Sequence, residues 1–193
     1  MTIKIPTKRK ILDSAKKIFA SKGFDGTSVE EIANDAGVKK ALIFYYFPTK
    51  DSLFLEAWTE GINELERHIF GNTQRENSYL SKLKRVLISY IDFVMSRKEI
   101  MKLIEMDKMR IIDSQSETDV NMQPLKLRYN SFIKKIENLI DEGKQKDCIP
   151  QTIPTRGTAK LIAQSIGVNS INEDLNVDTI VKFIMKGLSV KED

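Results

Sequence analysis

The ionisable side chains that stand out in this sequence are lysines, and the excess of positive charge lies at the N-terminal end. Residues 1–50 hold ten Lys and Arg against five Asp and Glu, a net charge of +5, whereas residues 51–193 carry −1. A local excess of this kind is typical of a surface that binds a polyanion. A solvated basic face has the same composition. The charge distribution alone leaves both interpretations open.

Residues suited to catalysis or metal binding are scarce. The chain has one cysteine, Cys148, and one histidine, His68, which excludes most pairs of nucleophile and base. The spacings typical of a dinucleotide site, a P-loop, a serine hydrolase, a zinc protease and a CxxC pair are all absent. We therefore expect no enzyme, no catalytic residue, no metal site and no cofactor, and we interpret His68 as a surface residue.

The sequence predicts that these lysines lie on helices or beside them. Apolar residues recur with a helical period, and no sustained alternation with period 2 indicates a strand. The hydrophobic fraction of 41% and the charged fraction of 30% are those of an ordinary globular protein. We expect an all-α fold of about nine helices, over residues 7–21, 28–36, 39–47, 50–70, 78–96, 98–114, 122–145, 155–171 and 177–188.

Residues 27–47 have the spacing of a helix-turn-helix. Ser28 and Glu31 fit a capping box, and Gly37 tolerates the positive φ of a tight turn. In this motif the second helix lies in the major groove of DNA and the first crosses the backbone. The motif needs a small residue at the crossing, an apolar residue in the turn, inward apolar residues and an outward contacting face. These are supplied by Ala33, by Val38, by Ile43 and Phe47, and by Lys39, Lys40, Leu42 and Tyr45.

The same region resembles the tetracycline-repressor (TetR) family. The resemblance covers about the first 55 residues without a gap, and it is carried by Gly23-Phe24, Gly26-Thr27-Ser28, Ile32-Ala33, Ala36-Gly37-Val38, Lys40, Tyr45-Tyr46-Phe47, Lys50 and Leu53. It implies a three-helix DNA-binding domain over residues 1–48. A helical effector-binding and dimerisation domain would follow over residues 49–193.

The resemblance also implies which residues contact DNA. Thr27 and Ser28 would meet a phosphate at a helix N-terminus, where free N–H groups favour anions. Tyr45 would bind phosphate or stack on sugar, and Lys50 would hold the backbone. The whole implied set is Thr27, Ser28, Lys39, Lys40, Ala41, Leu42, Phe44, Tyr45 and Lys50.

Three of these positions depart from the family pattern. Phe44 stands where the family usually has tyrosine, so it has no hydroxyl for a phosphate. Lys39 replaces a short hydroxyl residue, which adds charge but loses a helix cap. Leu42 stands where threonine is common and can make only apolar contact, such as with a thymine methyl group. DNA binding is compatible with all three changes.

The central helices carry more apolar residues than one amphipathic stripe requires, and methionines concentrate there. Filling of the core explains both observations. The alternative is an adaptable pocket wall, because thioethers repack around different ligands. In that case a small, mainly apolar effector would release the protein from its operator, and the predicted lining is Trp58, Ile62, Phe93, Met101, Ile104, Met109, Tyr129, Phe132 and Ile133.

The last two helices carry small and aliphatic residues at helical spacing. Burial within one chain is one interpretation, but we favour a homodimer interface, because recognition of half-sites by this motif normally requires a twofold dimer. The candidate interface residues are Ala159, Ile162, Ala163, Ile166, Gly167, Ile180, Val181, Ile184 and Leu188.

The sequence therefore predicts a cytoplasmic repressor with three partners: a double-stranded DNA operator, a second copy of the chain and a small hydrophobic effector. No membrane partner is expected, because no apolar run approaches the roughly 20 residues that span a bilayer. The N-terminus also lacks the pattern of a secretory signal. Two alternatives stay open, a helical protein-interaction module and a regulator without a small-molecule effector.

Overall fold

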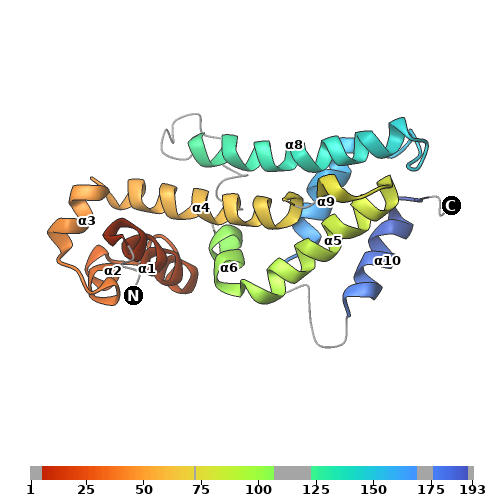
Figure 1. The fold of residues 1–193 in the computed structure, drawn as a ribbon. Coiled ribbons are helices and arrows are strands. Elements are labelled where there is room, and N and C mark those ends of the chain that lie inside the picture. The colour runs from red at the N-terminus through yellow and green to blue at the C-terminus, as the bar shows by residue number, and fades with distance from the viewer. Residues whose placement is uncertain (1–5, 72, 107–122, 169–175, 191–193) are drawn as a thin grey trace. The chain divides into compact units, whose positions relative to one another are not determined.

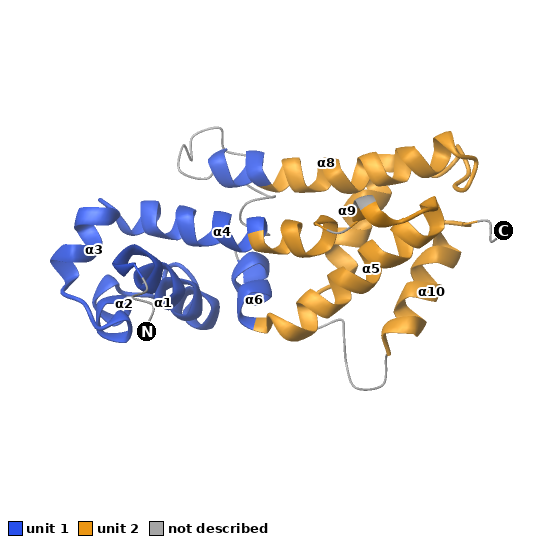
Figure 2. Cartoon of the chain, viewed as in Figure 1, with its two compact units in different colours: residues 1–63, 99–128 blue, residues 64–98, 129–193 orange. Residues whose placement is uncertain are grey.

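The computed structural model describes residues 6–71, 73–106, 123–168 and 176–190. Within these ranges all regular elements are helical, with nine α-helices, one short 3-10 helix and no strand (Figure 1). The expected all-α fold is thereby confirmed. The chain divides into two compact units, residues 1–63 with 99–128 and residues 64–98 with 129–193 (Figure 2).

Unit 1 begins with three helices, α1 (Thr7–Lys22), α2 (Val29–Ala36) and α3 (Lys40–Tyr46). Ala33, at the predicted crossing point, is fully buried, and so are the predicted inward residues Ile43 and Phe47. Val38 in the turn is half-buried. The head thus has the packing that its apolar pattern predicts.

Local signals fix the ends of these helices. Ser28 Oγ accepts the N–H of Glu31 while the Glu31 carboxylate accepts the N–H of Ser28, which is the predicted capping box. Gly37 has φ 65° and ψ 37°, and the N–H groups of Gly37 and Val38 close a Schellman motif on α2. Gly23 after α1 has φ 70° but ψ 177°. This combination lies outside the left-handed helical region, and its positive φ is one that glycine tolerates.

The rest of unit 1 comes from the first part of α4 (Lys50–Phe70), most of α6 (Lys98–Met106) and the start of α8 (Gln123–Gln145). Ion pairs join α1 to α4. The buried Lys16 ammonium lies 2.9 Å from the Glu60 carboxylate, and Lys8 lies 2.6 Å from Glu56. Lys16 also lies 3.3 Å from the Asp13 carboxylate. A buried cation is costly without such partners, so Glu60 contributes to holding α1 against α4.

Unit 2 contains the end of α4, the 3-10 helix η1 (Thr73–Arg75), α5 (Tyr79–Ser96), most of α8, α9 (Thr155–Ser165) and α10 (Val177–Gly187). The Tyr90 hydroxyl donates to the carbonyl of Ala163 over 3.2 Å, which links α5 to α9. The buried residues of α5 are Tyr79, Leu83, Val86, Leu87, Tyr90, Ile91, Phe93 and Val94.

Helix boundaries agree with the sequence in most places. The helix α9 ends at Ser165, earlier than the expected 171, and the expected helix end at 114 lies outside the described residues. The domain boundary near Pro48 stays a prediction; α4 contributes residues to both compact units.

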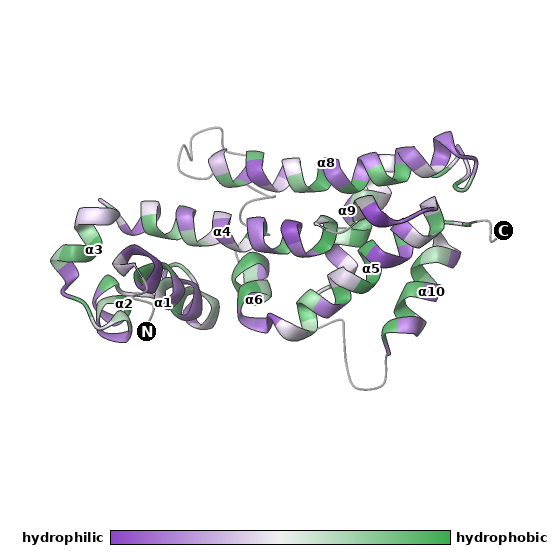
Figure 3. Cartoon of the chain, viewed as in Figure 1, coloured by the Kyte–Doolittle hydropathy of each residue, from purple (hydrophilic) through white to green (hydrophobic). Residues whose placement is uncertain are grey.

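Most helices carry both hydrophilic and hydrophobic residues along their length (Figure 3). Within the described ranges, none of the helices combines the length and the apolar character that a membrane crossing requires.

Candidate functional site

The outward face of α3 carries aromatic and basic side chains. Tyr45 is 78% exposed, and Phe44 and Tyr46 are also exposed. Lys39, Lys40 and Ala41 are exposed at the start of the helix, and Leu42 is half-buried. The Tyr45 and Tyr46 rings lie edge to face with centroids 5.2 Å apart. Exposed large aromatic rings are uncommon on a surface without a partner, so this face has the character of a binding surface.

The N-terminus of α3 has no side-chain cap. Lys39 occupies the cap position without a capping hydrogen bond, as the sequence predicts. Lys40 lies 3.4 Å from the Glu30 carboxylate on α2, where both groups are exposed. Exposed pairs of this kind contribute little to stability, so Lys40 can exchange Glu30 for a phosphate at little cost.

The two hydroxyl residues before α2 have internal roles. Thr27 is 3% exposed, and its hydroxyl donates to the carbonyl of Gly23 over 2.7 Å. This hydroxyl therefore holds the loop after α1 and is not presented to a phosphate, contrary to the implied role. Ser28 is exposed, but its Oγ caps α2.

The N-terminus of α2 is already occupied by a carboxylate. Glu31 accepts hydrogen bonds from the Lys22 ammonium and from the Ser28 N–H, and these lower its pKa from 4.5 to about 2. A phosphate that approached this helix end would meet the ionised Glu31 side chain. The geometry therefore favours α3 over the α2 N-terminus as the anion-binding part of the head.

The predicted effector residues are buried wherever the structure describes them. Trp58, Ile62, Met101 and Ile104 belong to unit 1, and Phe93, Tyr129, Phe132 and Ile133 belong to unit 2. Met109 lies outside the described residues. The Trp58 indole N–H is buried and has no acceptor among the described atoms.

An enclosed apolar space in unit 2 has a volume of only about 10 Å³, between α5 and α8 among other elements. Ligand pockets usually measure about 300–1,000 Å³, so this space cannot hold an effector. None of the predicted effector residues lines it.

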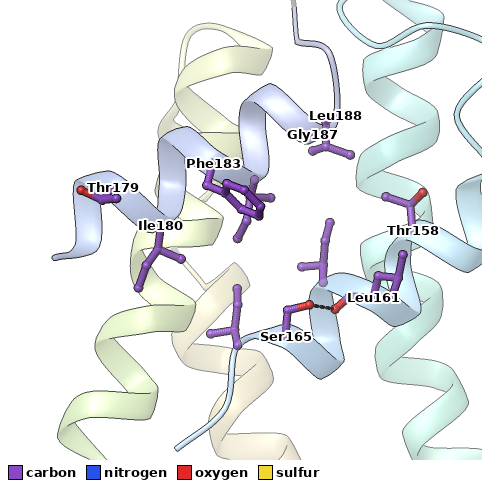
Figure 4. A pocket seen from close by; sticks show the side chains of 11 residues that line it. Thr158, Leu161, Ser165, Thr179, Ile180, Phe183, Gly187 and Leu188 are labelled. Atoms are coloured by element: carbon purple, nitrogen blue, oxygen red, sulfur yellow. Dashed lines mark hydrogen bonds between the residues drawn. The ribbon is translucent and has the colours of Figure 1, made fainter. Parts of the chain in front are cut away.

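The candidate dimer-interface residues of the last two helices fall into two groups, one that lines an open groove and one that does not. Between α9 and α10 lies an open apolar groove of about 570 Å³, with side chains from both helices directed towards it (Figure 4). Among the candidates, this groove is lined by Ile162, Ile166, Ile180, Ile184 and Leu188. Ala159, Ala163, Gly167 and Val181 are buried and do not line it.

The two exposed large hydrophobic residues of the groove are not among the residues predicted from the sequence. Phe183 is 79% exposed and Leu161 is 63% exposed. The available signal was the spacing of Ile180, Phe183 and Ile184, which places all three on one face of a helix.

His68 is exposed, as predicted, but it has a carboxylate partner that the sequence spacing did not reveal. Its Nε2 lies 2.9 Å from Asp92 Oδ2 on α5. No group of three or more potential metal ligands occurs among the residues that the structure describes.

The head therefore has the architecture of a helix-turn-helix DNA-binding domain. Residues 11–57 match the model of the family described as "Bacterial regulatory proteins, tetR family". IcaR of Staphylococcus aureus, the negative transcriptional regulator of the biofilm operon icaADBC, is 32% identical over 84 residues. That match spans 44% of this chain and 45% of IcaR, less than half of either protein.

Solved structures show the same fold over nearly the whole chain. The fatty acid degradation regulator FadR of Bacillus halodurans has a TM-score of 0.74 at 18% identity, covering 97% of this chain and 96% of its own. FadR of Bacillus subtilis, solved with stearoyl-CoA, has a TM-score of 0.72 at 16% identity, covering 93% and 96%.

By these matches the N-terminal head is similar to the helix-turn-helix domains of TetR-family transcriptional regulators. This is a family of regulators and not of enzymes, in agreement with the sequence analysis.

Proposed function

We propose that this chain is a dimeric transcriptional repressor that binds operator DNA through α3 and is released by a small, mainly apolar effector. The observation that carries the proposal is the outward face of α3, where exposed aromatic rings and lysines surround two buried anchors, Ile43 and Phe47. The similarity of the head to a negative regulator, IcaR, supports repression. Such a protein would act in the cytoplasm.

In the proposed complex α3 lies in the major groove. Lys39 and Lys40 approach phosphates or base edges at the start of the helix, and the small Ala41 lets the backbone come close to DNA. Phe44 and Leu42 make apolar contacts, and Tyr45 donates its hydroxyl to a phosphate or stacks on sugar. Lys50 stays in the proposed set as a backbone contact, whereas the buried Thr27 and the helix cap Ser28 are left out, because their hydroxyl groups are engaged within the head.

The test is a salt titration of DNA binding. A duplex selected from a randomised pool is titrated by fluorescence anisotropy at several salt concentrations. Replacing both Lys39 and Lys40 with Ala should weaken binding and lower the slope of log K against log salt by about two, one for each lost phosphate contact.

The control is a variant with the same change of charge on α6, Lys98→Ala with Lys102→Ala, since both lysines are exposed and lie outside the helix-turn-helix. It should leave affinity and slope unchanged. Equal losses in the two double variants would mean that net charge, not α3, governs binding.

The proposed dimer places two copies together at the α9–α10 groove. Burial of its apolar lining, including the exposed Phe183 and Leu161, would provide the driving force. A twofold interface presents the same patch from each copy and sets two α3 helices on two half-sites.

The proposed effector site lies at the buried residues around Trp58. An unpaired indole N–H in an apolar core costs about 1–3 kcal/mol, so an effector that accepts this hydrogen bond gains affinity. Stearoyl-CoA, bound by the Bacillus subtilis relative, suggests the first compound to test. Ligand and DNA would then oppose each other reciprocally, by a coupling of typically 1–3 kcal/mol.

Trp58 is the single tryptophan of the chain, so its fluorescence reports directly on this region. Stearoyl-CoA and other apolar acyl compounds should change its emission, and they should weaken DNA binding over the same concentration range. A compound that changes the emission but leaves DNA affinity untouched is not an effector.

A further inference from the structure

A second open groove lies in unit 2, between α5 and α10. It has a volume of about 600 Å³ and is lined by Lys84, Ile88, Asp178, Val181, Lys182, Met185, Lys186 and Val190. This volume falls within the usual range of small-molecule sites, about 300–1,000 Å³. None of the predicted DNA-contacting or effector residues lies in it.

The floor of this groove is apolar. Val181 and Met185 are buried at its base, and Ile88 from α5 is 39% exposed beside them. A large aliphatic side chain exposed next to buried apolar residues gives an apolar chain a surface to cover.

The rim is cationic. Lys84, Lys182 and Lys186 are exposed, and none of the three ammonium groups makes an ion pair or hydrogen bond with the residues that the structure describes. Lys182 and Lys186 are one helical turn apart on α10, a like-charge spacing that disfavours the helix slightly. Asp178 is the single carboxylate in the lining. The rim therefore presents more positive than negative charge above an apolar floor.

This groove is separate from the proposed dimer surface. Ile180, Phe183 and Ile184 of α10 line the α9–α10 groove, whereas Val181, Lys182 and Met185 line the second one. Successive positions on a helix are rotated by about 100°, so α10 presents these two sets on different faces.

We propose that the α5–α10 groove binds a free single-chain amphipathic anion, with a carboxylate head and an unbranched apolar tail. The carboxylate binds among Lys84, Lys182 and Lys186, and the tail covers Ile88, Val181 and Met185. Charge complementarity selects the anionic head, and the size of the groove favours a small molecule over a folded partner. This site is distinct from the effector site proposed around Trp58.

The test uses dodecanoate below its micellar concentration, measured by isothermal titration calorimetry with the full chain. Dodecyltrimethylammonium has the same tail and the opposite charge. We expect saturable binding of dodecanoate at one site that disappears when Lys182 and Lys186 are both changed to Gln, or weakens by about tenfold. The Ile88→Ser variant should weaken it as well, and dodecyltrimethylammonium should not bind there.

The control is Lys102→Gln with Lys160→Gln, which removes the same charge from two exposed lysines outside the groove. It should bind dodecanoate as the unaltered chain does. Undiminished binding by the Lys182 and Lys186 variant would overturn the proposal, even if Trp58 fluorescence reported a ligand elsewhere. Equal affinity for the two amphiphiles would also overturn it. Binding to vesicles of anionic lipid, with no binding to monomeric dodecanoate, would overturn the proposal as well.

Discussion

The Lys50 ammonium lies over the face of the Phe24 ring, with Nζ 4.4 Å from the ring centroid. Phe24 also packs edge to face against Phe54 of α4, with centroids 5.2 Å apart. The first residue of α4 is thereby held against the loop that follows α1. Both residues are half-buried, and a cation over an aromatic face gains about 0.5–2 kcal/mol between exposed and desolvated sites, so this contact positions the lysine.

Lys50 should still contact the DNA backbone. Replacing Lys50 with Ala should weaken binding to every DNA sequence and lower the salt slope by about one. The variant should also lose a small part of its stability, because the contact with Phe24 is gone. Anisotropy titration at several salt concentrations measures the slope, and urea denaturation measures the stability.

Phe24→Leu is the complementary variant, since it keeps the charge of Lys50 and removes the ring. It should lower stability through lost packing with Phe54 and leave the salt slope unchanged. If Lys50→Ala shows the same salt slope of DNA binding as the unaltered chain, Lys50 does not contact DNA. Its role would then be limited to the contact with the Phe24 ring.

Phe183 provides a test of the dimer that does not disturb the packed core. Because its side chain is 79% exposed in a single chain, Phe183→Glu should fold normally. The charge would be buried at the proposed interface, so the dimer dissociation constant should rise by about a hundredfold. Analytical ultracentrifugation gives this constant directly.

Leu127→Glu is the matched control, because Leu127 is an exposed leucine on α8 outside the α9–α10 groove. It should associate as the unaltered chain does. A monomeric unaltered chain at micromolar concentration would refute the proposed dimer.

Gly143 of α8 marks a close approach between two helices of unit 2. A Cβ at this position would overlap the Tyr79 hydroxyl and ring. Tyr79 is buried, and its hydroxyl has no hydrogen-bond partner among the described atoms, so the ring is placed by packing alone. Gly143→Ala should therefore destabilise the fold by about 1–3 kcal/mol through overpacking. Urea denaturation measures the change.

Gly157→Ala in α9 is the control, since a Cβ there meets nothing closer than the Pro154 ring at 4.0 Å. It should be neutral or stabilise the fold by up to about 1 kcal/mol, as expected for alanine in a helix. Equal destabilisation by both changes would show that the contact with Tyr79 is not the cause.

The stability of the head should depend on the ionisation of Glu31. Hydrogen bonds from the Lys22 ammonium and from the Ser28 N–H lower the pKa of Glu31 from 4.5 to about 2. A carboxylate whose pKa is lower in the folded than in the unfolded state stabilises the fold at pH values above its ordinary pKa. This contribution is lost as the pH falls from 4.5 towards 2. Glu31→Gln should therefore reduce the loss of stability over this range.

Titration of the Glu31 carboxyl carbon by NMR tests the cause separately. In the Lys22→Met variant the pKa of Glu31 should rise towards its ordinary value, because the largest cause of the shift is removed. An unchanged titration curve in that variant would remove Lys22 from the explanation.

The features that the sequence predicted well are those set by neighbouring residues. The capping box joins Ser28 to Glu31, and the left-handed turn depends on Gly37 alone, so both follow from local rules. The inward positions Ile43 and Phe47 follow from helical periodicity in the same way.

The features that the sequence missed depend on residues far apart in the chain. Lys16 pairs with Glu60 and His68 with Asp92, and no spacing rule predicts either pair. The family resemblance implies a phosphate contact for Thr27, which precedes α2. Its hydroxyl instead donates a hydrogen bond to the Gly23 carbonyl. Phe183 was missed because its exposure depends on which face of α10 the rest of the fold covers.

Tyr45 and Phe183 permit the most direct test, because they are aromatic residues of nearly equal exposure, 78% and 79%. The photoreactive residue p-benzoylphenylalanine is placed at position 45 or at position 183, and each protein is irradiated while bound to a selected duplex. We expect position 45 to cross-link to DNA and position 183 to cross-link to a second copy of the chain. If position 45 forms no DNA adduct under conditions where the duplex is fully bound, α3 is not the DNA-binding element.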